Sequence, residues 1–366
     1  MRCRLGWQLA AAGAVAVCVL AAAVLLGEPW QRDAHERPSE PARGAAEAFV
    51  FADQAPNITS YWLADAQNPS VRKLLATVRH PPGRSGEASV SPDGRWLAYT
   101  VLPPAAADPD HQAELWLLRL AGGAERAAAG VDLLSFLVWS PDSASVTFER
   151  VADQGIELWR QTLGADRAHL LQAAAPSEVL IPAGYDREGA RLIAARLGPA
   201  GTDIVRIAPT GLSVVSHAGS RSGRDFVLSP DRTQLAFLSA AGVVKQPEYQ
   251  AQEVDLSTGS TRQVGQQGTQ AIGLAWRPDG VLTIGGAGAT SGLRTASGSP
   301  IFPSTTPGFE QPLAWSSSGT RLAVRRFSGE SVADPGSAQD LLIEPNGARR
   351  AITSVDPVQF VGWIAQ

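Results

Sequence analysis

The chain has 366 residues, of which 44% are hydrophobic and 18% charged, so it holds enough apolar side chains for a sizeable folded core. Its formal net charge of −4 argues against a nucleic-acid partner, which would require a basic surface. Both cysteines, Cys3 and Cys18, lie near the N-terminus, so the remainder of the chain has neither a disulfide nor a cysteine-based metal site.

Residues 1–27 are predicted to be a membrane anchor or signal segment. Arg2 and Arg4 precede an almost unbroken apolar run of 18 residues, from Leu9 to Leu26, which is near the shortest helix that spans a bilayer. The arginines should stay in the cytoplasm, which places the following domain outside it, at the membrane surface. Cleavage as a signal peptide, which would make the protein secreted, and lipidation at Cys18 stay open as alternatives.

Residues 28–46 mix charges, prolines and small side chains without periodicity, as is typical of a flexible tether. From residue 47 to residue 366 the chain alternates short apolar runs with clusters of glycine, proline, aspartate and serine. This alternation of short apolar runs with turn-forming residues predicts one all-β domain. Its first three strands are expected at residues 48–53, 60–64 and 71–78.

A repeated corner then follows, first as Ser-Pro-Asp-Gly at residues 91–94. The residue three places before the turn acid is usually tryptophan or aliphatic, and seven such positions recur 39 to 49 residues apart. They are Val90, Trp139, Ala183, Leu228, Trp276, Trp315 and Trp363. This period matches the four-stranded blade of a β-propeller, most simply with seven blades and alternatively with six. The unit that begins at Trp276 is degenerate after its second strand.

The end of the chain supplies a single strand, VQFVGW, at residues 358–363. Together with the three N-terminal strands it would complete one blade, so that the ring closes without open edges.

The recurring residues of the corner are interpreted as structural. Proline, aspartate and glycine each have a local task in a tight turn, so Asp93, Asp142, Asp186, Asp231 and Asp279 are not expected to bind a ligand. The tryptophans share a fixed phase that indicates packing between blades. The five histidines are not spaced as metal ligands, and we expect neither a metal nor a cofactor.

One set of acids is a candidate site. Glu87, Glu178, Asp225, Glu310 and Asp356 lie at the expected starts of inner strands, which would gather at one end of the central channel. Several acids around one opening would favour a cationic ligand or a basic partner surface.

The stretches SVSPDGRWLAYTV, LVWSPDSASVTF and FVLSPDRTQLAF resemble the TolB-type (WD-like) β-propeller repeats of bacterial envelope proteins. The resemblance covers roughly residues 48–366 and implies an extracytoplasmic propeller that binds proteins. Similar blades occur in prolyl-oligopeptidase-type enzymes, but no Gly-x-Ser-x-Gly nucleophile motif occurs in this sequence.

The sequence therefore predicts a membrane-tethered, non-catalytic propeller that binds an envelope protein or a small cationic ligand. The alternative is a lactonase- or lyase-like propeller enzyme with a divalent cation in its channel. A sensor coupled to a cytoplasmic module is disfavoured.

Overall fold

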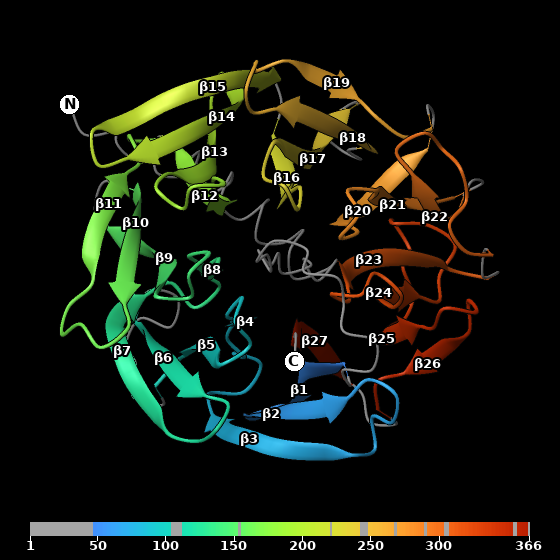
Figure 1. Cartoon of the computed structure of the whole chain (residues 1–366), viewed down its shortest axis with the longest axis horizontal. Helices are drawn as coiled ribbons and strands as arrows, with labels where there is room; N and C mark the ends of the chain where they lie inside the picture. The colour runs from blue at the N-terminus through green and yellow to red at the C-terminus, as the bar shows by residue number, and fades with distance from the viewer. Residues whose placement is uncertain are drawn as a thin grey trace, which may run out of the picture.

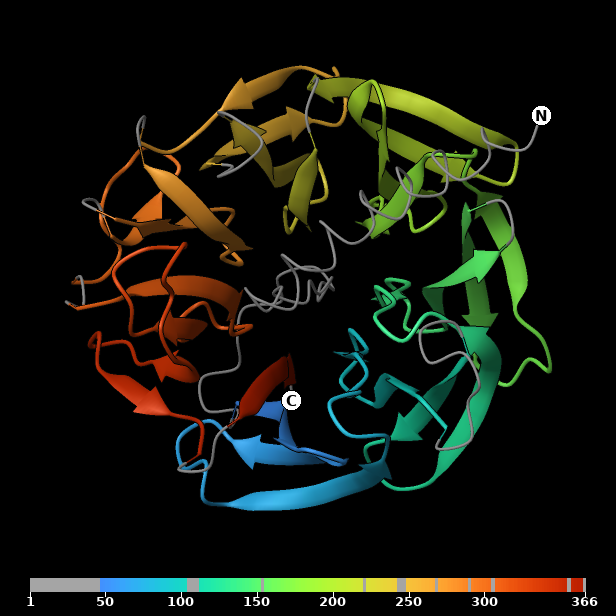
Figure 2. The same ribbon diagram turned by 180° about the vertical axis from the view of Figure 1, so that it is seen from behind.

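The computed structural model describes residues 47–103, 112–152, 155–219, 222–241, 248–266, 269–288, 291–303, 307–353 and 357–364. These residues form 27 strands arranged as seven blades in a closed ring (Figure 1). The same ring is seen from its other side in Figure 2. The prediction of an all-β, seven-bladed propeller is confirmed, and the six-bladed alternative is wrong.

Each blade is an antiparallel sheet whose strands follow one another from the channel outward. Blade 1 comprises β4 (Ala88–Val90), β5 (Trp96–Val101), β6 (Ala113–Arg119) and β7 (Ala124–Val131). Blade 2 comprises β8 (Val138–Trp139), β9 (Ser145–Ala152), β10 (Gly155–Thr162) and β11 (His169–Ala173). Blade 3 comprises β12 (Val179–Tyr185), β13 (Leu192–Gly198), β14 (Gly201–Ala208) and β15 (Gly211–Gly219).

The remaining blades follow the same order. Blade 4 comprises β16 (Gly223–Leu228), β17 (Gln234–Ala241), β18 (Glu248–Asp255) and β19 (Thr261–Gln263). Blade 5 comprises β20 (Gln270–Trp276), β21 (Leu282–Ala287) and β22 (Gly292–Thr295). Blade 6 comprises β23 (Phe309–Trp315), β24 (Leu322–Phe327), β25 (Ala338–Ile343) and β26 (Arg349–Ala351). Blade 7 comprises β27 (Val358–Ile364), β1 (Ala48–Ala55), β2 (Ile58–Asp65) and β3 (Arg72–Arg79).

Blade 7 closes the ring with one strand from the end of the chain and three from its beginning. β27 lies innermost and pairs antiparallel with β1, from Ala48 opposite Ile364 to Asp53 opposite Val358. The predicted one-plus-three closure is therefore confirmed. Asp340 of blade 6 reinforces it, because its Oδ2 accepts a hydrogen bond from the main-chain nitrogen of Phe360 at 2.7 Å.

Blade 5 is the unit that the sequence marked as degenerate, and it has three strands in the described part of the chain. A short bridge between Arg294 and Pro300 covers part of the outer edge of β22. Proline has no N–H to offer a further strand, so this edge is protected from pairing with another chain.

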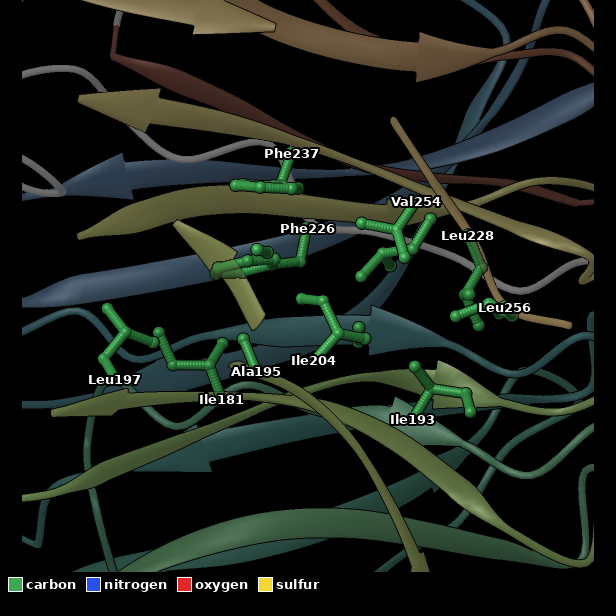
Figure 3. Packing of buried hydrophobic residues seen from close by; sticks show 13 residues of the cluster. Ile181, Ile193, Ala195, Leu197, Ile204, Phe226, Leu228, Phe237, Val254 and Leu256 are labelled. Atoms are coloured by element: carbon green, nitrogen blue, oxygen red, sulfur yellow. The ribbon is translucent and has the colours of Figure 1, made fainter. Parts of the chain in front are cut away.

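The hydrophobic core lies between the blades. Seven clusters of buried apolar side chains each join two neighbouring blades, and together they complete the circle. Figure 3 shows the cluster between blades 3 and 4, where the stacked rings of Phe226 and Phe237 pack against Ile181 and Ile204. The ring is thus stabilised by repeated sheet-on-sheet burial of apolar surface.

The tryptophans at the ends of the inner strands belong to these interfaces, as predicted. Trp139 Nε1 donates to the carbonyl of Ser89 at 3.1 Å, and Trp276 Nε1 donates to that of Val227 at 3.1 Å. Trp363 Nε1 donates in the same way to the carbonyl of Ala314 at 2.9 Å. Each bond runs from one inner strand to the inner strand of the preceding blade.

The repeated corner is held by its own side chains. In blade 1, Ser91 Oγ donates to Asp93 Oδ1 at 2.6 Å, and Asp93 Oδ1 accepts from the main-chain nitrogen of Arg95 at 3.0 Å. Ser91 Oγ also accepts from the nitrogen of Trp96 at 2.9 Å. Ser140 with Asp142, and Ser229 with Asp231, repeat this arrangement in blades 2 and 4. Asp93, Asp142 and Asp231 thus each have the local task in the turn that the sequence predicted.

The alignment of the third unit was wrong by two residues. The nitrogen of Gly189 donates to the carbonyl of Asp186, as that of Gly94 does to Ser91, so Asp186 occupies the serine place of the corner. Glu188 takes the acid place, and Tyr185, not Ala183, corresponds to the tryptophan. Tyr185 also bridges blades, with its hydroxyl 2.6 Å from Thr147 Oγ1.

The predicted anchor and tether, residues 1–46, lie outside the described residues. Within the part of the chain that the structure describes, no helix has the length and apolar character needed to cross a membrane.

Candidate functional site

The candidate site is the end of the channel at which the inner strands begin, which we name the channel mouth. The seven innermost strands, β4, β8, β12, β16, β20, β23 and β27, are the first strands of equivalent blades, so their starts share one end of the ring. Four of the predicted acids lie there: Glu87, Glu178, Asp225 and Glu310. Asp356 lies outside the described residues.

Two of the acids stand where the sequence predicted them, immediately before an inner strand. Glu87 precedes β4 and Glu178 precedes β12, and both side chains are half-buried. Gln359 Nε2, on β27, donates to Glu87 Oε2 at 3.4 Å, and Gln359 Oε1 accepts from Gln54. The nearest cation to Glu178 is Arg196, with 4.0 Å between Nε and Oε1.

The other two acids lie inside their strands and are buried, which corrects their predicted place in open strand starts. Glu310 is the second residue of β23, and Arg349 of β26 binds both its oxygens at 3.0 and 2.8 Å. Its side chain is only 1% exposed, so this carboxylate is neutralised within the blade. The channel mouth is therefore a mixed-charge surface and not a ring of free acids.

Asp225 is the third residue of β16, and its carboxylate is buried beside Arg224. The pair is 3.9 Å apart between Arg224 Nε and Asp225 Oδ2, too far for a hydrogen bond. Both carboxylate oxygens, and Nε and Nη2 of the guanidinium, are buried without a hydrogen-bond partner among the described residues. The guanidinium lies over the ring of Tyr249, with 4.1 Å between Cζ and the ring centroid.

The backbone explains this placement. The register of β16 and β17 shifts between Arg224 and Val227, and Asp225 has a positive φ of 55°. Aspartate tolerates this left-handed conformation better than most residues, but the conformation still costs free energy. The bulge turns the carboxylate out of the regular strand pattern. Burial raises the pKa of Asp225, although the charge of Arg224 opposes that shift.

A buried pair of opposite charges without hydrogen bonds is costly, because each group has lost its water and gained no full partner. Such unsatisfied groups in strained backbone are concentrated at functional sites. A ligand that donates to Asp225 and accepts from Arg224 would satisfy both. The sequence prediction included Asp225 but not Arg224, although the adjacent Arg-Asp pair directly before the apolar residues 226–228 was a visible signal.

A second polar network next to the channel mouth was also missed. Arg325 binds Asp340 through two hydrogen bonds, of 2.7 and 3.1 Å, and both side chains are largely buried. Because Asp340 also receives the bond from Phe360, this network holds the closing strand and has a structural role.

No group of three or more histidine, cysteine, aspartate or glutamate side chains is placed to bind a metal ion within the described ranges. Of the histidines, His80 is buried against Thr59. His217, on the outermost strand β15 of blade 3, is bound to Asp203 of the neighbouring β14.

Known proteins resemble this chain in structure only. No protein-family model and no curated protein matches it. Among solved structures, it is similar to TolB from Acinetobacter baumannii, at 14% identity and a TM-score of 0.49, over 83% of this chain and 65% of that one. It is also similar to a prolyl endopeptidase, at 15% identity and a TM-score of 0.61, over 97% of this chain and 55% of that one.

A third similar structure is the β-propeller domain of the Trilobed protease from Pyrococcus furiosus, at 11% identity and a TM-score of 0.56, over 85% of this chain and 95% of that domain. The chain spans about two thirds of the TolB protein and about half of the endopeptidase. At these identities the similarity shows the fold alone, and the TolB-like resemblance of the repeats holds as a β-propeller fold.

Proposed function

We propose that the chain is a membrane-tethered, extracytoplasmic propeller that acts as a non-catalytic binding scaffold of the cell envelope. Its partner binds at the channel mouth, and Arg224 and Asp225 are part of the contact. The tether and the anchor rest on the sequence of residues 1–46.

The observation that supports the binding site is the Arg224–Asp225 pair. Its four unpartnered polar atoms are buried on an innermost strand, in a backbone with a positive φ. A purely structural pair would be expected to close into direct hydrogen bonds, as Arg325 and Asp340 do in blade 6. The open pair instead leaves its hydrogen-bonding capacity for a partner.

The charges at the channel mouth favour a protein partner over a small cation. Glu178, Asp225 and Glu310 each have an arginine within 4.0 Å, so both signs of charge are present there. A protein surface carries both signs of charge and can match such a pattern, which gives specificity and orientation.

Site-specific photocrosslinking in the membrane-bound full chain tests this function. A photoreactive amino acid is placed at Glu178, at the start of β12, and as a matched control at Arg187, in the exposed corner that follows the end of the same strand. We expect the same envelope protein to be captured repeatedly from position 178 and not from position 187. Asp225→Asn should reduce that capture severalfold, whereas the exposed Asp166→Asn should not.

Two outcomes would contradict the proposal. Capture from position 187 alone would move the interface to the other end of the ring. One divalent ion per purified chain, with loss of binding when it is removed, would favour the enzyme alternative with a metal in the channel.

A further inference from the structure

A pocket lies between blades 4 and 5, and the Arg224–Asp225 pair is not part of its lining. Its cavity is small, about 20 Å³, and opens into a space free of protein atoms that reaches about 370 Å³ when open solvent is included. Blade 4 contributes residues of β18 and β19, and blade 5 contributes residues of β20, β21 and β22. The polar side chains of its lining are Gln250, Gln263, Gln266, Thr269, Arg294 and Thr295.

The shortened blade accounts for the opening. In the described ranges blade 5 has three strands where its neighbour has four, so no full outer strand among these residues covers the side of blade 4 at this point. Gly286 and Gly292 lie opposite each other in β21 and β22 and line the pocket without side chains to fill it. The result is a gap between two blades that are otherwise tightly packed.

Among the described residues of this lining, Arg294 is the only charged one, and none is a carboxylate. It stands opposite Ile284 in the sheet, and Ile284 packs in the apolar cluster between blades 4 and 5, so the two side chains share the face that looks toward blade 4. Arg294 Nη1 donates to the carbonyl of Gly298 at 3.1 Å, which fixes one side of the guanidinium. Within the part of the chain that the structure describes, its Nε is buried and has no hydrogen-bond partner.

We infer that this pocket binds the carboxylate of a small organic acid. The unpartnered Nε–H of Arg294 donates to the carboxylate, and side-chain amides and hydroxyls of the lining supply neutral donors around it. A single negative charge matches the single guanidinium. Inorganic phosphate, which carries more charge, would leave an excess negative charge in a half-enclosed site.

The pocket does not include the Arg224–Asp225 pair, and none of Glu87, Glu178 or Glu310 lines it, although Thr269 and Ala271 at the start of β20 do. It adds a second ligand class, a small anion, to the proposed protein partner.

Isothermal titration calorimetry on the whole purified chain tests acetate binding, with sodium acetate as the probe at constant ionic strength. We expect saturable binding of acetate, weaker binding of inorganic phosphate and no binding of glycerol. Arg294→Gln should raise the acetate dissociation constant tenfold or more, because a charged hydrogen bond is lost. Arg167→Gln, which removes an exposed arginine elsewhere, is the charge-matched control and should leave acetate binding unchanged.

Absence of saturable acetate binding by the unaltered protein would overturn the inference, as would equal affinities of the unaltered and Arg294→Gln proteins. Phosphate binding more tightly than acetate would overturn the choice of carboxylate. If Arg294→Gln does not fold, Arg294→Lys is used instead, since it keeps the charge but lacks the Nε donor, and it must also weaken acetate binding. Asp225→Asn should leave acetate binding intact, which separates this result from a failure of the proposed function.

Discussion

The indole nitrogen of Trp139 donates a hydrogen bond to the main-chain carbonyl of Ser89, 50 residues earlier, across the boundary between two blades. Trp139 is 3% exposed, so both groups lie in the interior. The same bond recurs from Trp276 and from Trp363, each to a carbonyl 49 residues earlier. The polar end of each ring therefore fixes the position of one blade on the next, while its apolar surface fills the gap.

Replacement of Trp139 by phenylalanine should lower the free energy of unfolding by about 2 kcal/mol, because a buried carbonyl loses its donor and the core loses volume. Urea unfolding followed by circular dichroism measures the change. Trp159→Phe is the control, since Trp159 Nε1 donates to Glu157 within its own blade in a less buried setting. An equal loss in both variants would argue against a special role of the bond between blades.

Asp225→Asn should stabilise the fold at neutral pH. Burial raises the pKa of Asp225, so the folded state binds its proton more tightly than the unfolded state. The stability of the unaltered protein must then fall as the pH rises from the ordinary value of 3.8 through the raised one. At pH 7 the variant should exceed it by about 1–3 kcal/mol, the usual cost of an unsatisfied buried group.

Unfolding by urea at pH 4 and at pH 7 checks this prediction, with the exposed Asp166→Asn as the charge control. The gain from Asp225→Asn should be smaller at pH 4 than at pH 7, because the unaltered carboxyl of the folded protein takes up its proton as the pH falls through its raised pKa. A gain that is the same at both pH values would assign it to the backbone and not to the charge.

The pKa of Glu47 is shifted in the opposite direction from that of Asp225, downward. Burial by itself would raise the pKa of Glu47, but hydrogen bonds from Ser318 and Arg321 outweigh it and hold the pKa below its ordinary value of 4.5. Its contribution to stability is therefore complete above pH 4.5 and is lost as the pH falls through the lowered value. Glu47→Gln should cost about 1 kcal/mol at pH 7 and progressively less in acid.

Thermal unfolding at a series of pH values measures this effect. Glu188→Gln, in an exposed corner, serves as the control. A pH dependence that is the same in Glu47→Gln and in the unaltered protein would assign the acid-sensitive contact to another carboxylate.

Removal of residues 358–366 should abolish cooperative folding. β27 contributes the buried side chains of Phe360, Val361 and Trp363, and its loss would expose the inner edge of β1. Calorimetry and size-exclusion chromatography would show this as aggregation or as a missing unfolding transition. A chain ending at Ile364 is the control. A soluble truncated monomer that unfolds cooperatively would contradict the role given to the closing strand.

The repeat pattern was sufficient to predict the ring, because the corner and the tryptophan each depend on residues close together in the sequence. The closure of the ring could be predicted because the single strand at the end of the chain and the three strands at its beginning together make up one blade. The shift in blade 3 arose because Asp186 and Glu188 both resemble the turn acid, and only the main-chain hydrogen bonds distinguish them.

The candidate site was less predictable, because its charge depends on contacts between distant residues. Arg349 neutralises Glu310 from a strand 39 residues later in the chain, and no local pattern indicates that pairing. The bulge at Asp225 likewise depends on how β16 meets β17, whereas the sequence alone placed this residue at an open strand start.

The antiparallel pairing of β27 with β1 also determines how the ring would respond to mechanical force. Ala48, at the beginning of β1, lies opposite Ile364, at the end of β27. Tension applied between these two residues would load one hydrogen-bonded pair at a time and peel the strands apart like a zipper, whereas shear would load all the pairs together. Blade 7 would therefore yield first under such tension, at low force, while the other six blades kept their strands.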